Sequence, residues 1–274
     1  MKTTVIYHAG CFDGVAGAWV VRKMLREEGE KDESIVYHPA MYGSIPPEIT
    51  GKNVVIVDFS YPRPEMETII ELAHHVTVID HHKTAKEALE GLEGANIYFD
   101  MEKSGAGLAW DILMRQARPQ AIDYIEDRDL WKFRYPGTKP FIAGLASTDL
   151  TIDNFEHAVT WPLKYVEKGH AILDYISTFG KKVGEHVNMK DISGWVVPVI
   201  NTPYMNSSDH VDTLIDQLPG YTFYAYFFLN KTGRWQFGLR SRGDFDVSEV
   251  AKRFGGGGHK NAAGFDVERL PWDV

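Results

Sequence analysis

The sequence predicts an α/β protein, with a parallel sheet flanked by helices, a helical connector and a second, smaller α/β domain. Short apolar, β-branched runs alternate with segments of helical periodicity in the first half of the chain. The middle of the chain lacks strand-like runs, and they return after it. We therefore expect a first domain at residues 1–150, a connector at 151–192 and a second domain at 193–274.

The first domain is expected to alternate strands with helices. The run at residues 54–57 is uninterrupted Val and Ile, which is typical of a central parallel strand buried on both faces. Ser104 is a good N-cap and Pro119 a good opening residue for two of the helices. The expected strands are residues 3–8, 35–38, 54–57 and 76–79, and the expected helices are 15–26, 65–73, 104–115 and 119–127.

The second domain is expected to contain strands at residues 195–200, 221–229 and 234–239, with helices at 209–218 and 247–254. Four consecutive glycines, 255–258, then interrupt the pattern of regular elements. The connector before this domain has only helical periodicity, broken by glycines. This change of character along the chain is the reason for expecting two domains.

Composition limits the function classes. The chain of 274 residues is 44% hydrophobic and 24% charged, and no apolar run approaches the length of a membrane span. Its first residues turn polar too soon for a signal peptide. Cys11 is the single cysteine, so no intrachain disulfide can form. We expect a cytoplasmic protein with no membrane partner, and a homodimer is compatible with the sequence.

The charge distribution favours a small anionic ligand. A net charge of −9 repels long polyanions and argues against binding to long duplex DNA. Residues 231–264 nevertheless carry seven basic and three acidic residues. Such a cationic patch suits a small anion, and an ordinary solvated face is the alternative interpretation.

Chemically active side chains follow three of the expected parallel strands. Open parallel sheets bind ligands at the carboxyl ends of their strands, so these side chains are expected to meet at one edge. Another carboxylate group, which includes Asp127 and Asp129, follows a predicted helix. The residues at the three strand ends are His8, Cys11, Asp13, Asp58, Asp80, His81 and His82.

These residues predict a metal centre. Carboxylate and imidazole ligands without a thiolate cluster suit Mn²⁺, Mg²⁺ or Fe²⁺. Closely packed carboxylates repel one another unless cations lie between them, and Asp58 is the natural bridge between two cations. Each residue also has an interpretation without a metal. His8 can be a structural histidine, Asp58 and Asp80 can be helix N-caps, and Asp13 with Gly14 can form an ordinary turn. Their coincidence at one sheet edge favours the metal centre.

The same residues carry a family resemblance. The ordered motifs resemble those of the DHH phosphoesterase family, and the segment from Gly255 to Gly264 resembles the signature of that family's associated second domain. The resemblance extends from His8 to Gly264, over nearly the whole chain. The motifs are His8-x-x-Cys11-x-Asp13-Gly14, Val57-Asp58, Asp80-His81-His82 and Asp127-x-Asp129-Leu130-Trp131.

The resemblance implies a role for each motif residue. His8, Asp13, Asp58, His81 and Asp127 match metal ligands, with Asp58 as the bridge and Asp129 as the alternative to Asp127. Asp80 and His82 match residues that support the site or contact phosphate, and together with Asp58 and His81 they form the expected catalytic set.

Cys11 departs from the family pattern, because many members have aspartate at this position. Two interpretations remain open. If Cys11 packs as an inert side chain, the first metal position keeps His8 and Asp58 and is weaker. If Cys11 binds as a thiolate, a softer metal is favoured.

The glycine-rich segment is expected to bind phosphate. Backbone N–H groups of Gly256, Gly257 and Gly258 can approach an anion closely, and His259 can add a hydrogen bond. Arg240 and Arg242 are expected to contribute bidentate hydrogen bonds. A flexible surface loop is the alternative.

The resemblance therefore implies a manganese-dependent phosphoesterase with two metal ions, acting in the cleft between its domains, with Mg²⁺ and Fe²⁺ as alternative ions. Short oligonucleotides or small nucleotides are the expected substrates. Exopolyphosphatase or pyrophosphatase activity is the first alternative, and a non-catalytic nucleotide-binding protein is the second.

Overall fold

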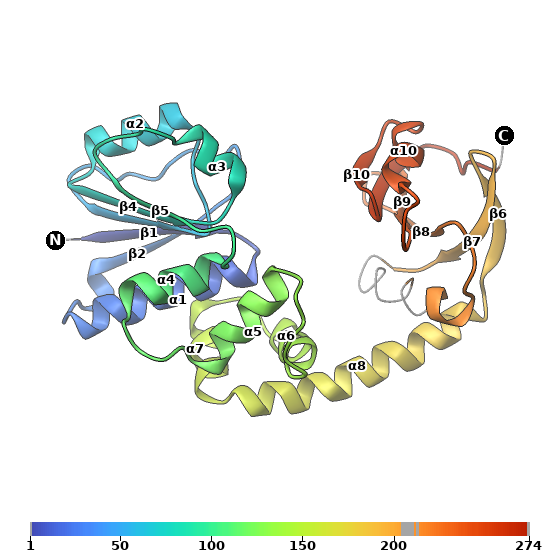
Figure 1. Ribbon diagram of the computed structural model, residues 1–274, viewed down its shortest axis with the longest axis horizontal. Helices are drawn as coiled ribbons and strands as arrows, with labels where there is room; N and C mark the ends of the chain where they lie inside the picture. The colour runs from blue at the N-terminus through green and yellow to red at the C-terminus, as the bar shows by residue number, and fades with distance from the viewer. Residues whose placement is uncertain (1, 204–210, 212–213, 273–274) are drawn as a thin grey trace. The chain divides into compact units, whose positions relative to one another are not determined.

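The computed structural model describes residues 2–203, 211 and 214–272 and divides into two compact units, Met1–Ile172 and Leu173–Val274 (Figure 1). The division falls inside helix α8 (Pro162–Gly184). Of the helix expected at residues 209–218, residues 211 and 214–217 are helical, and 209, 210, 212 and 213 lie outside the described residues. Among the helices that the structure describes, none is long and apolar enough to cross a membrane.

The first unit is built on a five-stranded parallel sheet, which confirms the predicted fold class. Its strand order is β2-β1-β3-β4-β5, with every neighbouring pair parallel. Four strands match the expected runs, and β5 at the edge was not expected because its sequence is only four residues long. The strands are β1 (Thr3–His8), β2 (Ile35–Ala40), β3 (Asn53–Val57), β4 (His75–Asp80) and β5 (Asn96–Phe99).

Helices cover both faces of this sheet (Figure 1). Helices α1 (Phe12–Glu27) and α4 (Gly105–Leu113) lie on one face, and α2 (Arg63–Leu72) and α3 (Lys83–Ala88) lie on the other. Three further helices follow, of which two pack against α1 and the middle one, α6, packs against those two, and a short 3-10 turn (Asp32–Ser34) precedes β2. These three are α5 (Gln120–Asp129), α6 (Thr138–Ala146) and α7 (Ile152–Thr160).

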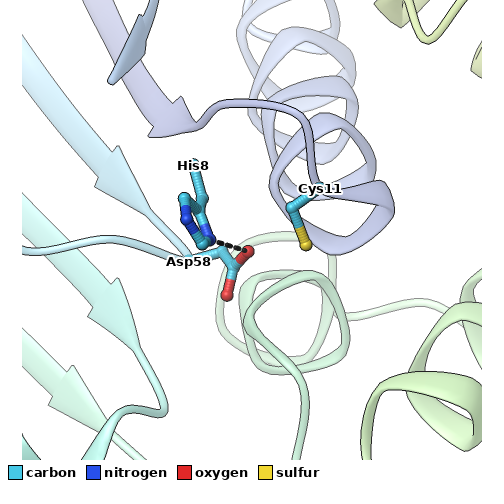
Figure 2. A group of neighbouring side chains, drawn as sticks. All are labelled: His8, Cys11 and Asp58. Atoms are coloured by element: carbon cyan, nitrogen blue, oxygen red, sulfur yellow. Dashed lines mark ion pairs between the residues drawn. The ribbon is translucent and has the colours of Figure 1, made fainter. Parts of the chain in front are cut away.

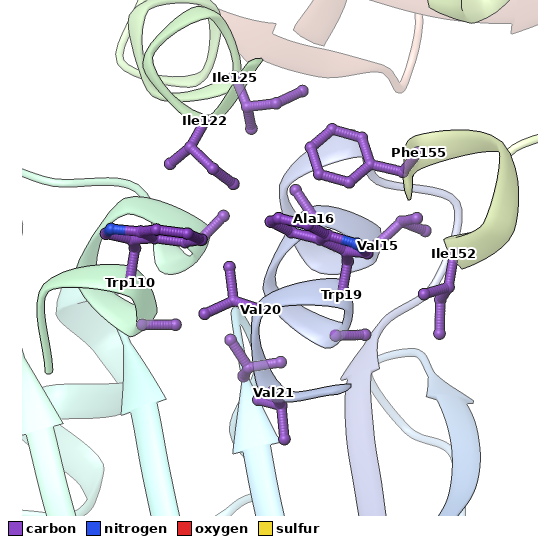
Figure 3. Close-up of a cluster of buried hydrophobic side chains, with 14 of the residues drawn as sticks. Val15, Ala16, Trp19, Val20, Val21, Trp110, Ile122, Ile125, Ile152 and Phe155 are labelled. Atoms are coloured by element: carbon purple, nitrogen blue, oxygen red, sulfur yellow. The ribbon is translucent and has the colours of Figure 1, made fainter. Parts of the chain in front are cut away.

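The larger core of the first unit fixes α1 against the sheet and against α4 (Figure 3). Trp19 of α1 stacks on Trp110 of α4 with ring centroids 5.9 Å apart, and Phe155 of α7 meets Trp19 edge-on. The buried Arg22 side chain binds Asp153 and Glu156 of α7. The start of α1, where Asp13 lies, is therefore held by a rigid apolar layer.

The second unit contains a six-stranded mixed sheet with the order β10-β11-β9-β8-β7-β6. Only β7 and β8 pair in parallel. Helix α10 (Val247–Lys252) packs on a core that includes Phe237 and Phe265. The strands are β6 (Asn188–Ile192), β7 (Trp195–Asn201), β8 (Tyr224–Leu229), β9 (Trp235–Arg240), β10 (Gly257–His259) and β11 (Ala262–Val267).

Two parts of the second unit differ from expectation. Strand β6 lies in the stretch expected to be helical, because its polar residues give no strand signal and it is stabilised by pairing with β7. The glycine run was expected to interrupt regular structure, yet Gly257 and Gly258 continue into β10 and pair with β11. Glycine is needed at Gly258, whose φ of 144° disfavours other residues.

Candidate metal centre

Three parallel strands bring the predicted site residues to one edge of the sheet. His8 ends β1, Asp58 directly follows β3 and Asp80 ends β4. Tyr7 pairs with Val57, and Val57 pairs with Ile79, so the three strand ends are in register. The next residues along the chain after each strand therefore meet at this carboxyl-terminal edge.

Asp58 is the central residue of the cluster. Its side chain is only 2% exposed, and its backbone has a φ of 53°, a left-handed conformation that costs energy for a residue with a side chain. Its Oδ1 atom lies 3.1 Å from Nε2 of His81, and its Oδ2 atom lies 3.7 Å from Nδ1 of His8. One carboxylate oxygen thus faces each histidine, as a bridging ligand would require.

The Oδ2 atom of Asp58 is buried and has no hydrogen-bond partner among the described residues. A distance of 3.7 Å to His8 is too long for a hydrogen bond. A buried carboxylate oxygen without a partner costs free energy, because it has lost its water. This orphaned oxygen fits a site that is completed by a cation.

A first group of donor atoms lies around that oxygen. One ligand atom each from His8, Cys11 and Asp58 lies within 4.8 Å of the other two. Figure 2 shows His8 and Cys11 on either side of the Asp58 carboxylate. The three residues come from the end of β1, the N-cap of α1 and the end of β3.

A second group consists of Asp13, His81 and Asp129, again with donor atoms within 4.8 Å of one another. Nε2 of His81 lies 3.8 Å from Asp13 Oδ2 and 3.6 Å from Asp129 Oδ2. Asp58 of the first group contacts His81 of the second, so the two groups are contiguous. A third donor group, Asp58 with His81 and His82, overlaps both.

The N-terminus of α4 holds Asp13 in place. The backbone N–H groups of Gly105 and Ala106 donate to Asp13 Oδ2 and Oδ1, at 2.6 and 3.0 Å. Ser104 caps the helix by accepting from the Gly107 N–H, as the sequence predicted for the start of this helix. The partial positive charge of the helix end favours the buried carboxylate.

Gly105 allows this close approach. A Cβ atom at this position would lie 2.5 Å from the Cβ of Asp58 and 3.1 Å from Asp13 Oδ2. No side chain fits there without displacing one of the two aspartates. Local residue patterns do not predict this requirement, because Asp13 and Asp58 are both far from Gly105 along the chain.

The acidic groups strongly perturb one another. Burial, and then the charges of Asp58 and Asp129, raise the pKa of Asp13 well above its ordinary value. Burial opposes ionisation of Asp58, but its contacts with the two histidines outweigh burial and lower the pKa of Asp58 to about 2. Burial alone would lower the pKa of His81, yet its bond to Asp58 and the charge of Asp13 raise it to about 9. In the protein alone, a charged His81 offsets part of the carboxylate charge, which is a role that a divalent cation can take.

Asp80 positions its neighbours and belongs to none of the donor groups among the described residues. Its fully buried carboxylate accepts from the His81 N–H at 2.7 Å, from His82 Nδ1 at 2.7 Å and from the Ser60 hydroxyl at 2.7 Å. The hydrogen bond to Asp80 is also the main reason that the pKa of His82 is raised. Asp80 therefore orients the His82 ring, in line with the supporting role that the resemblance implied.

Asp127 does not join the cluster, whereas Asp129 does. The Asp127 carboxylate accepts from the backbone N–H groups of Arg134 and Tyr135 and from the Thr138 hydroxyl. Two residues further along α5, Asp129 reaches His81. Residues two apart on a helix point to nearly opposite sides, so only one of the two aspartates can face the cluster. Of the two candidates, Asp129 lies in a donor group, and its role as a metal ligand stays a prediction.

An aromatic residue that the sequence did not single out lies beside the cluster. The Tyr42 side chain, in the loop after β2, is 60% exposed. Its ring centroid lies 5.6 Å from that of His8 and 6.3 Å from that of His82. A flat apolar ring is thus available to a ligand that binds at the two histidines.

In the second unit, the residues expected to bind substrate lie on the edge hairpin and on β9. Gly257, Gly258 and His259 are exposed on β10. The Arg240 guanidinium lies over the Tyr226 ring at 5.7 Å. Arg242 forms an ion pair with Asp216 at 2.8 Å. The Gly256 backbone is packed tightly, because a Cβ there would meet the Gly264 carbonyl oxygen at 2.1 Å.

Comparison with protein families gives two matches. The model described as the DHH family, N-terminal domain, matches residues 2–134. The model described as the DHHA1 domain matches residues 205–271. The first match contains every residue of the three donor groups, and the second contains the glycine-rich hairpin.

One relative is the uncharacterized protein R106 of Acanthamoeba polyphaga mimivirus. It is 30% identical to this chain over 283 residues, which cover 95% of this chain and 66% of the relative. The chain thus spans slightly less than two thirds of that relative's length.

Solved structures share the fold at low sequence identity. A pGpG-specific phosphodiesterase from Vibrio cholerae has a TM-score of 0.59 at 13% identity, covering 97% of this chain and 93% of its own. An exopolyphosphatase-related protein from Bacteroides fragilis has a TM-score of 0.55 at 14% identity, covering 98% and 88%. RecJ of Thermus thermophilus in complex with Mn²⁺ has a TM-score of 0.51 at 15% identity, covering 96% and 49%.

Proposed function

The chain belongs to the DHH phosphoesterase family, and from that premise we propose that it hydrolyses phosphate esters of short oligonucleotides or small nucleotides at the cluster around Asp58. The observation that carries the proposal is the position of Asp58 between two contiguous donor groups, with one carboxylate oxygen facing His8 and the other facing His81. A carboxylate in this position suits a two-cation hydrolase site.

The residues present fit a pair of divalent cations. His8 and Asp58, with Cys11 beside them, would hold the first, and Asp13, His81 and Asp129 would hold the second, with Asp58 in contact with His81. The second group offers only oxygen and nitrogen donors, for which Mn²⁺ is our proposed ion. Bound cations would polarise the phosphoryl group and make water acidic enough to act as a nucleophile near neutral pH. RecJ of Thermus thermophilus, of the same fold, was solved with Mn²⁺.

His82 is the side chain that we assign to the substrate phosphate. Its Nδ1 is occupied by Asp80, which fixes the ring, and the ring is half-buried beside His81. Because the hydrogen bond to Asp80 raises the pKa of His82, the charged form that attracts a phosphate oxygen is favoured. Asp80 and Ser60 act through His82, as positioning residues.

Tyr42 supports a substrate that carries a base. An exposed aromatic ring next to the two histidines offers a stacking surface, and stacking on aromatic side chains is a sequence-tolerant way to bind a nucleobase. Polyphosphate has no group that would use this ring. The observation therefore favours nucleotides over the exopolyphosphatase alternative.

The second unit supplies the proposed phosphate-binding residues. The exposed backbone of β10 and its last residue, His259, are available to an anion. Arg240 lies at the end of β9, which is separated from β10 by β11. We propose Gly257, Gly258, His259 and Arg240 as contacts of a substrate phosphate, with Gly256 shaping the turn. Arg242 is already paired with Asp216, so it has the smaller part.

An assay with three substrates tests this proposal. Purified protein with Mn²⁺ is given a short oligoribonucleotide, a linear dinucleotide and, separately, inorganic polyphosphate. Release of mononucleotides supports the proposal, whereas release of orthophosphate alone selects the exopolyphosphatase alternative. The Asp58→Asn variant is expected to lose turnover, and the matched Asp32→Asn variant, at an exposed residue paired with Arg26, is expected to retain it. Equal activity in the two variants would refute the assignment of the site.

A further inference from the structure

Cys11 is where this cluster departs from the family pattern. It occupies the N-cap of α1 without making a side-chain capping hydrogen bond. Cys11 is only partly buried, so it is not simply a core residue. Its sulfur lies within 4.8 Å of donor atoms of both His8 and Asp58.

A second observation indicates that a ligand completes this side of the cluster. The Asp58 oxygen that faces His8 is buried and has no hydrogen-bond partner among the residues that the structure describes. Figure 2 shows the sulfur and the imidazole directed toward this carboxylate from α1 and β1. An imidazole, a sulfur and a carboxylate oxygen around one point form a donor set that metal ions bind.

The two donor groups differ in chemical softness. Asp13, His81 and Asp129 present carboxylate oxygens and an imidazole, whereas the group at Asp58 and His8 includes sulfur. Thiolate ligands favour Zn²⁺ and related softer ions, and all-oxygen or oxygen–nitrogen sets suit Mn²⁺ or Mg²⁺. The asymmetry is therefore a property of the residues, and Cys11 is its source.

We propose that Cys11 binds, as a thiolate, the cation held by His8 and Asp58, and that it gives this position a preference for a softer ion such as Zn²⁺ or Co²⁺. The position at Asp13, His81 and Asp129 keeps its preference for Mn²⁺. When the sulfur–metal bond forms, the thiol proton is released to solvent. The inference rests on the proposed two-cation site and specifies which ion each half of it takes.

Cobalt absorption tests the inference without measuring turnover. Co²⁺ is added to the metal-free wild-type protein, and the near-ultraviolet charge-transfer band of a cobalt–thiolate bond is recorded. Because the chain has one cysteine, the band reports on Cys11 alone. We expect the band in the wild type and its complete loss in Cys11→Asp, with Co²⁺ still bound. Absence of the band in a wild-type protein that binds Co²⁺ would overturn the inference.

Thiol alkylation gives a second test that needs no variant. The rate of Cys11 modification by iodoacetamide is measured in metal-free protein, with Mn²⁺ alone and with Zn²⁺ alone. A coordinated sulfur is unavailable as a nucleophile, so Zn²⁺ is expected to slow alkylation by about tenfold or more. Equal rates with and without Zn²⁺, in protein shown to contain Zn²⁺, would contradict coordination by Cys11.

Metal competition tests selectivity. After dialysis against Zn²⁺ and a large excess of Mn²⁺, which offsets the higher affinity of Zn²⁺ for most donor sets, the wild type is expected to retain both ions. The Cys11→Asp variant, which restores the family's aspartate, is expected to lose Zn²⁺ preference by about tenfold. An unchanged ratio of the two ions in Cys11→Asp would overturn the proposed selectivity.

The tests distinguish failure of this inference from failure of the proposed function. A cobalt–thiolate band without any phosphoesterase activity would refute the proposed function and leave this inference standing. Mn²⁺-supported activity without the band would refute this inference and leave the proposed function standing.

Discussion

Gly105 and Asp58 lie so close together that a Cβ atom on the glycine would be 2.5 Å from the Cβ of the aspartate. The helix that begins at Gly105 donates two backbone hydrogen bonds to Asp13. The position of α4 therefore sets the spacing between Asp13 and Asp58, the two buried carboxylates that face the same histidine, His81.

Replacing Gly105 with alanine is expected to disable the cluster more than it destabilises the protein. The added methyl group must push Asp58 or α4 aside, at a cost of about 1–3 kcal/mol in unfolding free energy. Metal affinity should fall by roughly 10–100-fold because the donors are displaced. Calorimetric titration with Mn²⁺ and thermal unfolding measure the two effects. In the contrasting Ser104→Ala variant, loss of the helix cap should cost about 1 kcal/mol with little change in affinity, and equal affinity losses in both variants would argue against this account.

Asp129→Asn and Asp127→Asn are expected to have opposite consequences. Asp129 faces His81, so its amide variant should weaken Mn²⁺ binding while leaving stability nearly unchanged. Asp127 accepts three hydrogen bonds from residues 134–138, so its variant should retain metal and lose about 1–3 kcal/mol of stability. Metal content and denaturant unfolding distinguish the two. Loss of metal in Asp127→Asn with retention in Asp129→Asn would reverse the assignment.

The stability difference caused by Asp127 should depend on pH in a defined direction. Burial opposes its ionisation, but hydrogen bonds from Thr138 and from the backbone of Arg134 and Tyr135 outweigh burial and lower the pKa of Asp127. A carboxylate with a lowered pKa stabilises the folded state above its unfolded pKa of about 3.9, and this contribution disappears as pH falls through the folded value. The difference in unfolding free energy between wild type and Asp127→Asn should thus be largest near neutral pH and shrink below about pH 4. A difference that is constant with pH would show that the charge is not involved.

Asp80→Asn is expected to lower turnover without removing metal. The variant cannot accept the His82 hydrogen bond as an anion, so the His82 ring is no longer fixed. Loss of such an orienting carboxylate typically costs about 10–100-fold. Turnover and KM measured beside metal content distinguish this from loss of a ligand. Full activity in Asp80→Asn would show that turnover does not depend on the orientation of the His82 ring by Asp80.

Tyr42→Ala is expected to discriminate between substrate classes. Loss of one base-stacking contact, worth about 1–3 kcal/mol, should raise KM for a dinucleotide by about tenfold or more. Hydrolysis of a phosphate ester without a base should be unchanged, and Tyr42→Phe should behave as wild type. An equal change for both substrates would show that Tyr42 supports the cluster instead of binding a base.

The strands and their terminal residues could be predicted because the signals are local. A run such as residues 54–57, followed by Asp58, identifies both a buried parallel strand and the functional residue at its end. His8 and His81 follow from the same rule. Strand β5 lacked this signal because it is only four residues long, and β6 because it is mostly polar; both are stabilised by pairing with a neighbouring strand.

The remaining features depend on contacts between distant parts of the chain. A motif match could not choose between Asp127 and Asp129, because the choice depends on which side of α5 faces His81. The need for glycine at position 105 arises from Asp58, and the place of Tyr42 beside His8 arises from the loop after β2. Each is a tertiary relationship with no trace in local residue patterns.

The number of divalent cations bound per chain tests the central claim most directly. Metal-free wild-type protein and the Asp58→Asn variant are titrated with Mn²⁺ and with Zn²⁺, and bound metal is counted by elemental analysis after gel filtration. The account predicts two ions per wild-type chain when both metals are supplied, and a large loss of both in Asp58→Asn because the shared carboxylate is weakened. A wild-type protein that retains no divalent cation, or an Asp58→Asn variant that retains two, would contradict it.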